Sequence, residues 1–515
     1  MPDIVTLGEL LRQRAAAHPD RIAIIIRDER VGYAEINRRA NRVANGLSAA
    51  GLKAGARIAL LDKNDTNYFE LQFGCAKAGM VLVPINWRLA PPEIAFIVKD
   101  AASEMLFYGP EFAPVIAAIR GELGNIPLVP LGAGGRDGYE AWRDRQSDGE
   151  LPARSTPDDT VLQLYTSGTT GRAKGVQLNA RGLLVSLPGF KNMGVCREDD
   201  VYLLAMPFFH IGGSAVAVMA VALGCPSVVV RDIDPKALLD AVATHRVTSS
   251  FLVPAVILFM LNVPSVGDTD LSSLRLILYG GSPIPVALLK RAMAVFKCGF
   301  GQVYGMTEAH GTITYLGAED HDPGNTERLK SCGRAIPDVE MKIVDADGNE
   351  VPDGTVGEVV CRAVKVMKGY WNRPEENARA IRDGWFHSGD AGYRDQDGYY
   401  FIYDRVKDMI VSGGENIYPA EVENALYGHP AIQDVAVIGV PDDTWGETVK
   451  ACVVLKQGAN ATADELILFA RQRIGGFKLP RSVDFMTEIP RNATGKFLKR
   501  ALREPYWRDR DRQVN

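Results

Sequence analysis

The chain has 515 residues, 46% hydrophobic and 23% charged, and 58 Lys and Arg side chains against 63 Asp and Glu give a formal net charge of −5. This ordinary globular composition excludes a disordered chain, and at roughly 150 residues per domain it predicts three or four folding units. The lack of a basic excess argues against a general nucleic-acid-binding protein, so any anion must be bound locally.

Cysteine usage and the N-terminus indicate a reducing compartment. The seven cysteines are scattered and include no CxxC pair, which argues against a disulfide framework or a zinc ribbon. Residues 1–5 lack the pattern of a signal peptide, so we expect a cytoplasmic protein. The longest apolar stretch, residues 211–230, is interrupted by glycines and Pro226. We therefore expect a buried helix, a turn and a strand there, with no membrane span.

Helical and strand-like patterns alternate along the first two thirds of the chain. Apolar stripes at helical spacing run from Leu7 to Ala15 and from Tyr33 to Leu47, each followed by a β-branched run, at 21–27 and 57–61. The same alternation of helical and strand-like patterns continues over residues 65–77, 80–85, 237–245, 249–253, 274–279 and 286–296. Such alternation predicts an α/β fold with mostly parallel sheets covered by helices.

The predicted secondary-structure pattern changes twice toward the C-terminus. From about Arg334 short strands with tight turns predict a small β subdomain, and after Asp404 the pattern favours a compact α+β unit. We therefore expect a large N-terminal domain over residues 1–404, with the β subdomain at about 334–404, and a small C-terminal domain over 405–515.

The stretch from Tyr165 to Val176 has the composition of a phosphate-binding loop. Its glycines allow backbone N–H groups to surround an anion, its hydroxyl side chains add donors, and Lys174 adds a compact positive charge. It lacks the spacing of a Walker A loop, which argues against P-loop kinases and GTPases. Composition alone also fits a flexible surface loop.

The order of residues in Thr166–Gly175 resembles the signature of the adenylate-forming superfamily, which contains acyl-CoA synthetases, luciferases and the adenylation domains of peptide synthetases. The family's other motifs follow in order over essentially the whole chain, at residues 206–210, 279–283, 302–308, 384–390, 404–410, 412–416 and 490–496. The resemblance implies a large N-terminal domain and a small mobile C-terminal lid joined at a hinge.

The resemblance also implies the reaction. A carboxylate attacks the α-phosphorus of ATP to give acyl-AMP and pyrophosphate, and a thiol, here CoA, then attacks the acyl carbon. Catalysis is expected to be mainly positional and electrostatic. The matched phosphate-binding residues are Thr166, Ser167, Gly168, Thr169, Thr170, Gly171 and Lys174. Thr307 and Glu308 match the magnesium segment, where Glu308 would help to place Mg²⁺; outside the motif they would be a plain helix start.

The nucleoside is expected to contact three further segments. The matched adenine-side residues are Gly280, Gly281, Ser282, Gln302, Tyr304, Gly305, Met306 and Thr307. Tyr304 would stack on adenine, Asp390 would accept both ribose hydroxyls, and Arg405 would contact ribose and phosphate. Core packing, a turn aspartate and a surface ion pair are the respective alternatives.

Lys496 resembles the family's catalytic lysine, which bridges the substrate carboxylate and the α-phosphate. Rotation of the C-terminal domain about Lys407 is expected to withdraw Lys496 after adenylation. The same rotation would bring Ser412, Gly413 and Gly414 to the site as part of the CoA channel.

The expected acyl pocket is apolar, which suits a hydrophobic acid. Its matched wall residues are Phe209, His210, Ile211, Val253, Tyr279, Gly280, Gly305 and Met306. Peptide-synthetase domains have an Asp where this chain has His210, and the chain ends at Asn515 with no carrier segment, so we expect a free-standing enzyme that uses CoA. Acetyl-specific relatives have a Trp in place of Gly305, so a longer or ring-bearing acid fits here.

Two substrate classes remain open. Residues 86–89 and 369–374 look most like bacterial fatty-acyl-CoA synthetases, although both segments are expected to lie outside the acyl pocket. This favours a medium- or long-chain fatty acid. His210 would also suit a phenol, which keeps a 4-coumarate-type or benzoate-type ligase open. A homodimer is compatible with the sequence.

Two further functional classes share the fold. A luciferase-like oxygenase would have every motif above and would be recognised by light emission. A non-enzymatic nucleotide sensor is expected to lack Lys496 or Glu308, and this chain has both.

Overall fold

The structure is a computed structural model of the chain. It describes residues 5–132, 138–166, 173–405, 408–412, 415–442, 445–491 and 497–508, with the backbone alone at 404, 405, 415, 416 and 446.

The N-terminal part contains a mixed sheet with the strand order β6-β5-β3-β4-β7-β8. Its strands are β3 (Arg57–Leu61), β4 (Val81–Pro84), β5 (Ser103–Tyr108), β6 (Leu128–Pro130), β7 (Thr160–Thr166) and β8 (Lys174–Asn179). Neighbours are parallel except β7 and β8. The helices of this part are α1 (Leu7–Ala17), α2 (Tyr33–Ala49), α3 (Thr66–Ala78), α4 (Pro91–Asp100), α5 (Ala113–Ile119) and α6 (Tyr139–Asp144).

A second mixed sheet has the order β15-β14-β13-β12-β11-β9-β10-β1-β2 and is parallel from β13 to β1. Its strands are β1 (Ile22–Ile26), β2 (Glu29–Gly32), β9 (Tyr202–Leu204), β10 (Ser227–Val229), β11 (Ser249–Leu252), β12 (Leu276–Gly280), β13 (Gly299–Met306), β14 (Gly311–Leu316) and β15 (Arg334–Ala335). Its helices are α7 (Ala180–Leu184), α8 (Leu187–Asn192), α9 (Ile211–Leu223), α10 (Pro235–His245), α11 (Pro254–Leu261) and α12 (Val286–Phe296).

The two sheets share one hydrophobic core. It contains Leu60 and Leu162 from the first sheet and Leu204 and Val229 from the second, together with the apolar faces of α1, α2, α3 and α9. The expected helix, turn and strand over 211–230 are confirmed, because α9 ends at Gly224, whose φ of 73° reverses the chain into β10. Within the described part of the chain, no helix combines the length and apolarity needed to cross a membrane.

An antiparallel sheet follows and forms the predicted β subdomain. Its strands are β16 (Glu340–Val344), β17 (Gly357–Arg362), β18 (Ile381–Arg382), β19 (Trp385–Arg394) and β20 (Tyr400–Arg405), and α13 (Pro374–Ala380) lies between β17 and β18 in the chain. The subdomain core joins that of the two larger sheets through Ile343, Val359 and Phe386.

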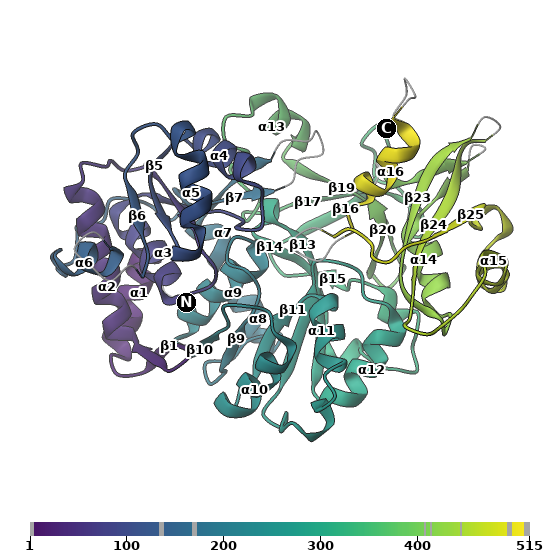
Figure 1. Ribbon diagram of the computed structural model, residues 1–515, viewed down its shortest axis with the longest axis horizontal. Coiled ribbons are helices and arrows are strands. Elements are labelled where there is room, and N and C mark those ends of the chain that lie inside the picture. The colour runs from purple at the N-terminus through teal and green to yellow at the C-terminus, as the bar shows by residue number, and fades with distance from the viewer. Residues whose placement is uncertain are drawn as a thin grey trace.

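The C-terminal part has its own sheet and its own apolar clusters, at the right of Figure 1. The strands are β21 (Ile410–Ser412), β22 (Glu415–Ile417), β23 (Ile432–Asp442), β24 (Gly446–Leu455) and β25 (Ser482–Phe485), with helices α14 (Pro419–Tyr427), α15 (Ala463–Arg471) and α16 (Lys499–Trp507). The fold is thus the predicted α/β architecture: a large N-terminal domain of mostly parallel sheets with a β subdomain, and a small C-terminal domain.

Candidate active site

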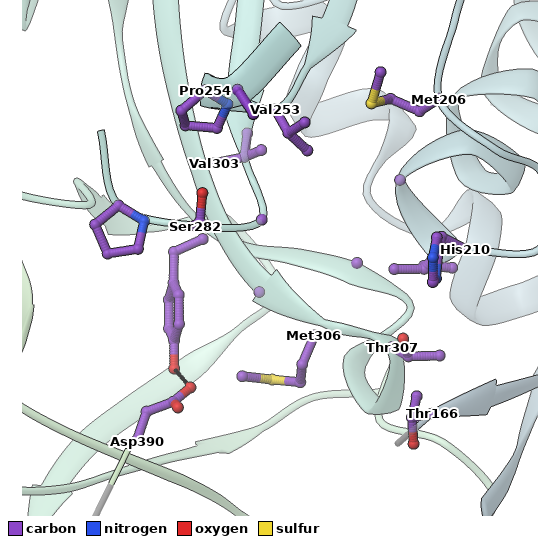
Figure 2. Close-up of a pocket in the computed structure, with 18 of the residues that line it drawn as sticks. Thr166, Met206, His210, Val253, Pro254, Ser282, Val303, Met306, Thr307 and Asp390 are labelled. Atoms are coloured by element: carbon purple, nitrogen blue, oxygen red, sulfur yellow. Dashed lines mark hydrogen bonds between the residues drawn. The ribbon is translucent and has the colours of Figure 1, made fainter. Parts of the chain in front are cut away.

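A large cavity lies where the carboxyl ends of several parallel strands meet. Residues that end or directly follow β7, β11, β12 and β13 line it, as does Met206 two residues after β9, and this is the position at which open α/β sheets bind ligands. Its volume of about 2640 Å³ exceeds the roughly 300–1,000 Å³ of a typical single-ligand site. The cavity therefore has room for a nucleotide and a second substrate together. Figure 2 shows part of its lining.

The phosphate end of the cavity is built on the β7–β8 pair. Thr166 and Lys174 are direct partners across these strands, and both line the cavity. The Lys174 ammonium lies 2.7 Å from a carboxylate oxygen of Glu376 on α13 and 5.0 Å from the centre of the Tyr370 ring. The cation expected to bind phosphate is thus held by an ion pair at the cavity wall.

Glu308 contacts the same tyrosine, Tyr370, that lies beside this cation. It belongs to a short 3₁₀ turn, Thr307–Ala309, directly after β13, and one of its carboxylate oxygens accepts a hydrogen bond of 2.9 Å from the Tyr370 hydroxyl. Among the described residues no cluster of three or more His, Cys, Asp or Glu forms a protein-only metal cage. Mg²⁺ commonly uses one or two carboxylates with substrate phosphates and water, so a single carboxylate at this position fits that ion.

Buried His310 fixes the turn that carries Glu308. Its Nε2 accepts a hydrogen bond of 3.0 Å from the backbone N–H of Asn179, and its Nδ1 lies 2.5 Å from the carbonyl oxygen of Lys365. These partners assign the proton to Nδ1. Burial lowers the pKa of His310 to about 3, so the ring is neutral and ties β8 and the 365 segment to the turn.

The nucleoside side of the cavity contains Tyr304 and Asp390. The Tyr304 hydroxyl donates a hydrogen bond of 2.7 Å to Asp390, the dashed line in Figure 2. Asp390 is only 6% exposed, and its backbone N–H donates to Ser388 Oγ at 3.0 Å. Ser282 lies on the same side of the cavity in Figure 2, and Gln302 also lines the wall.

Tyr279 and Gly280 differ from the expected acyl-pocket wall. Alternate residues of a strand face opposite sides, and on β12 Leu278 lines the cavity whereas Tyr279 is fully buried in the core behind it. The Tyr279 hydroxyl lies 3.0 Å from Nε2 of His321 and donates to Gln302 at 3.3 Å. Tyr279 therefore supports Gln302 from the core, and the prediction that it forms the pocket wall is wrong. Gly280, predicted in that wall and on the adenine side, is buried against Val303 and also lies outside the described lining.

The acyl side of the cavity is formed by the loop before α9 and by the strand ends facing it. The residues lining it include Phe209, His210, Ile211, Val253 and Met306. His210 precedes the first turn of α9. A Cβ on Gly213 would lie 2.3 Å from the carbonyl oxygen of Pro207, so glycine is what lets this loop pack on the helix.

Two glycines shape the acyl side directly. A Cβ on Gly212 would lie 2.6 Å from the ring of Phe251, which occupies the space beside this glycine. A Cβ on Gly305 would lie 1.8 Å from the carbonyl oxygen of Gly311 on β14, so close strand packing is a further reason for glycine at this position.

Several predicted residues lie outside the described part of the chain. These are Ser167, Gly168, Thr169, Thr170, Gly171, Lys407, Gly413, Gly414 and Lys496, and for Arg405 only the backbone is described. Ser412 lies in β21, opposite Glu415 and Gly446, and is not part of the described cavity lining. The roles of all these residues stay predictions.

Sequence reasoning missed two side chains at the phosphate end. Tyr370 belongs to the segment expected outside the acyl pocket, and it lies at the phosphate end, where it contacts Glu308 and Lys174. Glu376 follows in α13 and belongs to no motif; the sequence shows only that this segment is charged, with Glu375 and Arg379 on the same helix.

Comparisons with known proteins agree with this geometry. Residues 11–371 match the family model of the AMP-binding enzymes and residues 421–496 match the model of the AMP-binding enzyme C-terminal domain. The chain is 40% identical to the fatty acid–[acyl-carrier-protein] ligase ScoC of Streptomyces coeruleorubidus, over 100% of this chain and 99% of that protein. It is also 40% identical to a feruloyl-CoA synthase of an Amycolatopsis species, over 97% and 99%. The crystal structure of the anthranilate CoA ligase AuaEII in complex with anthranoyl-AMP superimposes with a TM-score of 0.91 at 27% identity, covering 98% of each chain.

The chain therefore belongs to the AMP-binding enzyme family, within the adenylate-forming superfamily. Within that class it is an AMP-forming acid–CoA ligase, which activates a carboxylic acid with ATP.

Proposed function

We propose that this enzyme activates a hydrophobic carboxylic acid, a medium- or long-chain fatty acid, as acyl-AMP and then transfers the acyl group to CoA. The observation that supports a hydrophobic acid as the substrate is the apolar lining of the cavity beyond His210. It is bordered there by Ile211 and Met306 and by apolar side chains of α8, α9 and α11. Burying an alkyl chain in such a site contributes about 0.8 kcal/mol per CH₂ group, whereas a polar chain would lose its hydration.

The first half-reaction joins a carboxylate oxygen to the α-phosphorus of ATP while the bond to the β-phosphate bridge breaks and pyrophosphate leaves. In this proposal Thr166 and Lys174 hold the β- and γ-phosphates, and Asp390 accepts the ribose hydroxyls beside the Tyr304 ring. Glu308 would hold Mg²⁺, which supplies positive charge to the phosphates. Lys496 would stabilise the negative charge that develops between the carboxylate and the α-phosphate.

The second half-reaction joins the CoA sulfur to the acyl carbon, and AMP leaves. We propose that the unit from residue 405 to the C-terminus rotates about Lys407 between the two steps and exchanges Lys496 for Ser412, Gly413 and Gly414. The separate sheet and separate apolar clusters of residues from Ile410 onward support a unit able to move as a body.

An aryl acid is the second candidate. The Phe251 ring against Gly212 offers a flat face to a substrate ring, and the feruloyl-CoA synthase shows that a relative this similar is named for an aryl acid.

The test is acid- and CoA-dependent release of AMP across a panel from acetate to palmitate, with cinnamate, ferulate, benzoate and amino acids included. The proposal predicts the highest kcat/KM for fatty acids of intermediate or greater length. A clear preference for the aryl acids would replace the first candidate by the second, and activity confined to acetate or amino acids would contradict both.

A further inference from the structure

Lys365 is a buried cation that the mechanism above does not use. The residue precedes the Met367–Tyr370 segment and is 2% exposed. Its ammonium donates hydrogen bonds of 2.9 Å to Ser186 Oγ and 2.8 Å to the backbone carbonyl of Thr312. These two acceptors are neutral.

The ammonium has three N–H donors, and within the described residues the hydrogen bonds to Ser186 and Thr312 account for two of them. Burial lowers the pKa of Lys365 to about 8. Asp338 acts on this ammonium electrostatically and raises its pKa, but the contacts of the described residues include no ion pair of 4 Å or less with Lys365. Burying a charge that no carboxylate contacts is unfavourable, so an acceptor supplied by a ligand would recover part of that cost.

The Lys365 ammonium lies along the acyl side of the cavity. It is 5.9 Å from the centre of the Phe190 ring, and Phe190 packs with Phe251 and Val303 on one apolar cluster. Phe251 in turn occupies the space beside Gly212, close to His210. Lys365, Ser186, Thr312 and Phe190 all line the same cavity as His210.

These contacts lead from Gly212 to the Phe251 ring, to the apolar cluster that Phe190 shares, and from Phe190 to the Lys365 ammonium. With the reacting carboxylate held beside His210, as in the proposed function, an acid that fills this space brings its distal end to Lys365.

We propose that Lys365 is a specificity-determining residue that selects hydrophobic acids with a second oxygen at the end remote from the reacting carboxylate. This inference rests on the proposed function, because it assigns the substrate class of the same pocket. The apolar rings bind the middle of such an acid, and its distal carboxylate or hydroxyl oxygen accepts the remaining N–H of Lys365. A methyl end at the same place would leave this buried donor without an acceptor, which is unfavourable.

The experiment compares pairs of acids that differ only in the distal oxygen, decanoate with decanedioate and cinnamate with para-hydroxycinnamate. The readout is acid-dependent ATP–pyrophosphate exchange by the full chain. The wild type is expected to prefer the oxygen-bearing member of at least one pair by about tenfold or more in kcat/KM.

Two variants separate recognition from folding. In Lys365→Met, kcat/KM for the oxygen-bearing acid is expected to fall by about tenfold or more. The kcat/KM for the methyl-ended or unsubstituted member of the pair is expected to change by less than about threefold. Lys365→Gln, whose amide group has two N–H donors and no charge, gives the same test if the methionine variant does not fold. Lys368→Met, at an exposed position of the same segment, is the control and is expected to leave kcat/KM unchanged for both acids of each pair.

Four results are decisive. A preference of the wild type for decanoate and cinnamate overturns the inference. An equal loss of kcat/KM for both acids of a pair in a Lys365 variant also overturns it, because Lys365 would then be structural. Exchange with decanoate alone would still support the proposed function. No ATP–pyrophosphate exchange with any acid would contradict the proposed function itself and, with it, the inference about Lys365.

Discussion

At the scale of single residues, the ion pair between Lys174 and Glu376 sets the state of the phosphate-binding cation. The two side chains are 12% and 24% exposed and lie 2.7 Å apart. ATP phosphates that bind Lys174 must compete with this carboxylate and approach its negative charge. Glu376→Gln is therefore expected to lower the KM for ATP by about threefold to tenfold, equivalent to roughly 0.7–1.4 kcal/mol, with little change in kcat.

The matched control for this prediction is Glu375→Gln. Glu375 precedes Glu376 on α13, but its side chain is 88% exposed and 3.8 Å from Arg379, so this variant is expected to leave the KM for ATP unchanged. Steady-state kinetics at saturating acid and CoA measure both variants. A higher KM for ATP in Glu376→Gln would show that the carboxylate assists nucleotide binding and would contradict the prediction.

His310 predicts a pH dependence of stability. Its pKa is about 3 in the folded protein, against the ordinary histidine value of about 6.5, so below pH 6.5 the unfolded chain takes up a proton that the folded protein does not. Stability is therefore lost as the pH falls from 6.5 toward 3, by about 2 kcal/mol between pH 7.5 and 5. Urea midpoints measured across this range are expected to fall less steeply in His310→Gln.

The control is His18→Gln, at an exposed position, which is expected to keep the wild-type slope. An unchanged slope in His310→Gln would show that other groups account for the acid sensitivity.

The sequence predicted site residues best where a motif carries them. Thr166, Lys174, Tyr304, Glu308 and Asp390 all line one cavity, although they come from strands and turns far apart in the chain. Tyr279 was assigned to the wrong face because a motif gives residue order but not which side of β12 faces the cavity. Glu376 and Lys365 escaped prediction because their roles depend on tertiary contacts with Lys174 and with Ser186 and Thr312.

At the scale of elements, the first turn of α9 sets the width of the acyl side. Gly212→Ala is expected to push the Phe251 ring into the pocket, because the new Cβ would start 2.6 Å from that ring. The KM for the longest acids is expected to rise by about tenfold, equivalent to roughly 1.4 kcal/mol, whereas the KM for ATP stays unchanged.

The double variant Gly212→Ala/Phe251→Ala is designed to restore the space and is expected to recover binding of long acids. If the single variant raises the KM for ATP and the KM for the acid equally, the substitution acts on the whole domain and not on the acyl side, which would contradict the prediction.

Element prediction succeeded where periodicity is strong. The strand 57–61 and the helix 286–296 match β3 and α12 at both ends, and the alternation of apolar segments predicted the parallel order of the sheets. Short elements such as β15, β18 and the turn with Glu308 depend on pairing or on hydrogen bonds from distant segments, and these leave no periodic signal.

At the scale of the whole molecule, the proposal divides the reaction between two positions of the C-terminal unit. Lys496→Ala is expected to lose ATP–pyrophosphate exchange by about a hundredfold or more, as removal of one transition-state charge partner does elsewhere. Conversion of synthetic acyl-AMP to acyl-CoA is expected to stay within about threefold of wild type, because the lysine is withdrawn in that step.

Lys456→Ala, at an exposed lysine that directly follows β24 in the C-terminal part, is the control and is expected to keep both activities. Equal loss of adenylation and thioester formation in Lys496→Ala would contradict the division of labour.

The central claim is that one cavity makes an acyl-adenylate of a hydrophobic acid and passes the acyl group to CoA. The most direct test is mass spectrometry of the products formed from ATP, Mg²⁺ and the preferred acid, first without CoA and then after CoA is added. The account predicts acyl-AMP and pyrophosphate in the first stage, and in the second the loss of acyl-AMP with equal amounts of AMP and acyl-CoA. ADP and phosphate as the products, or no acyl-AMP with any hydrophobic acid, would contradict it.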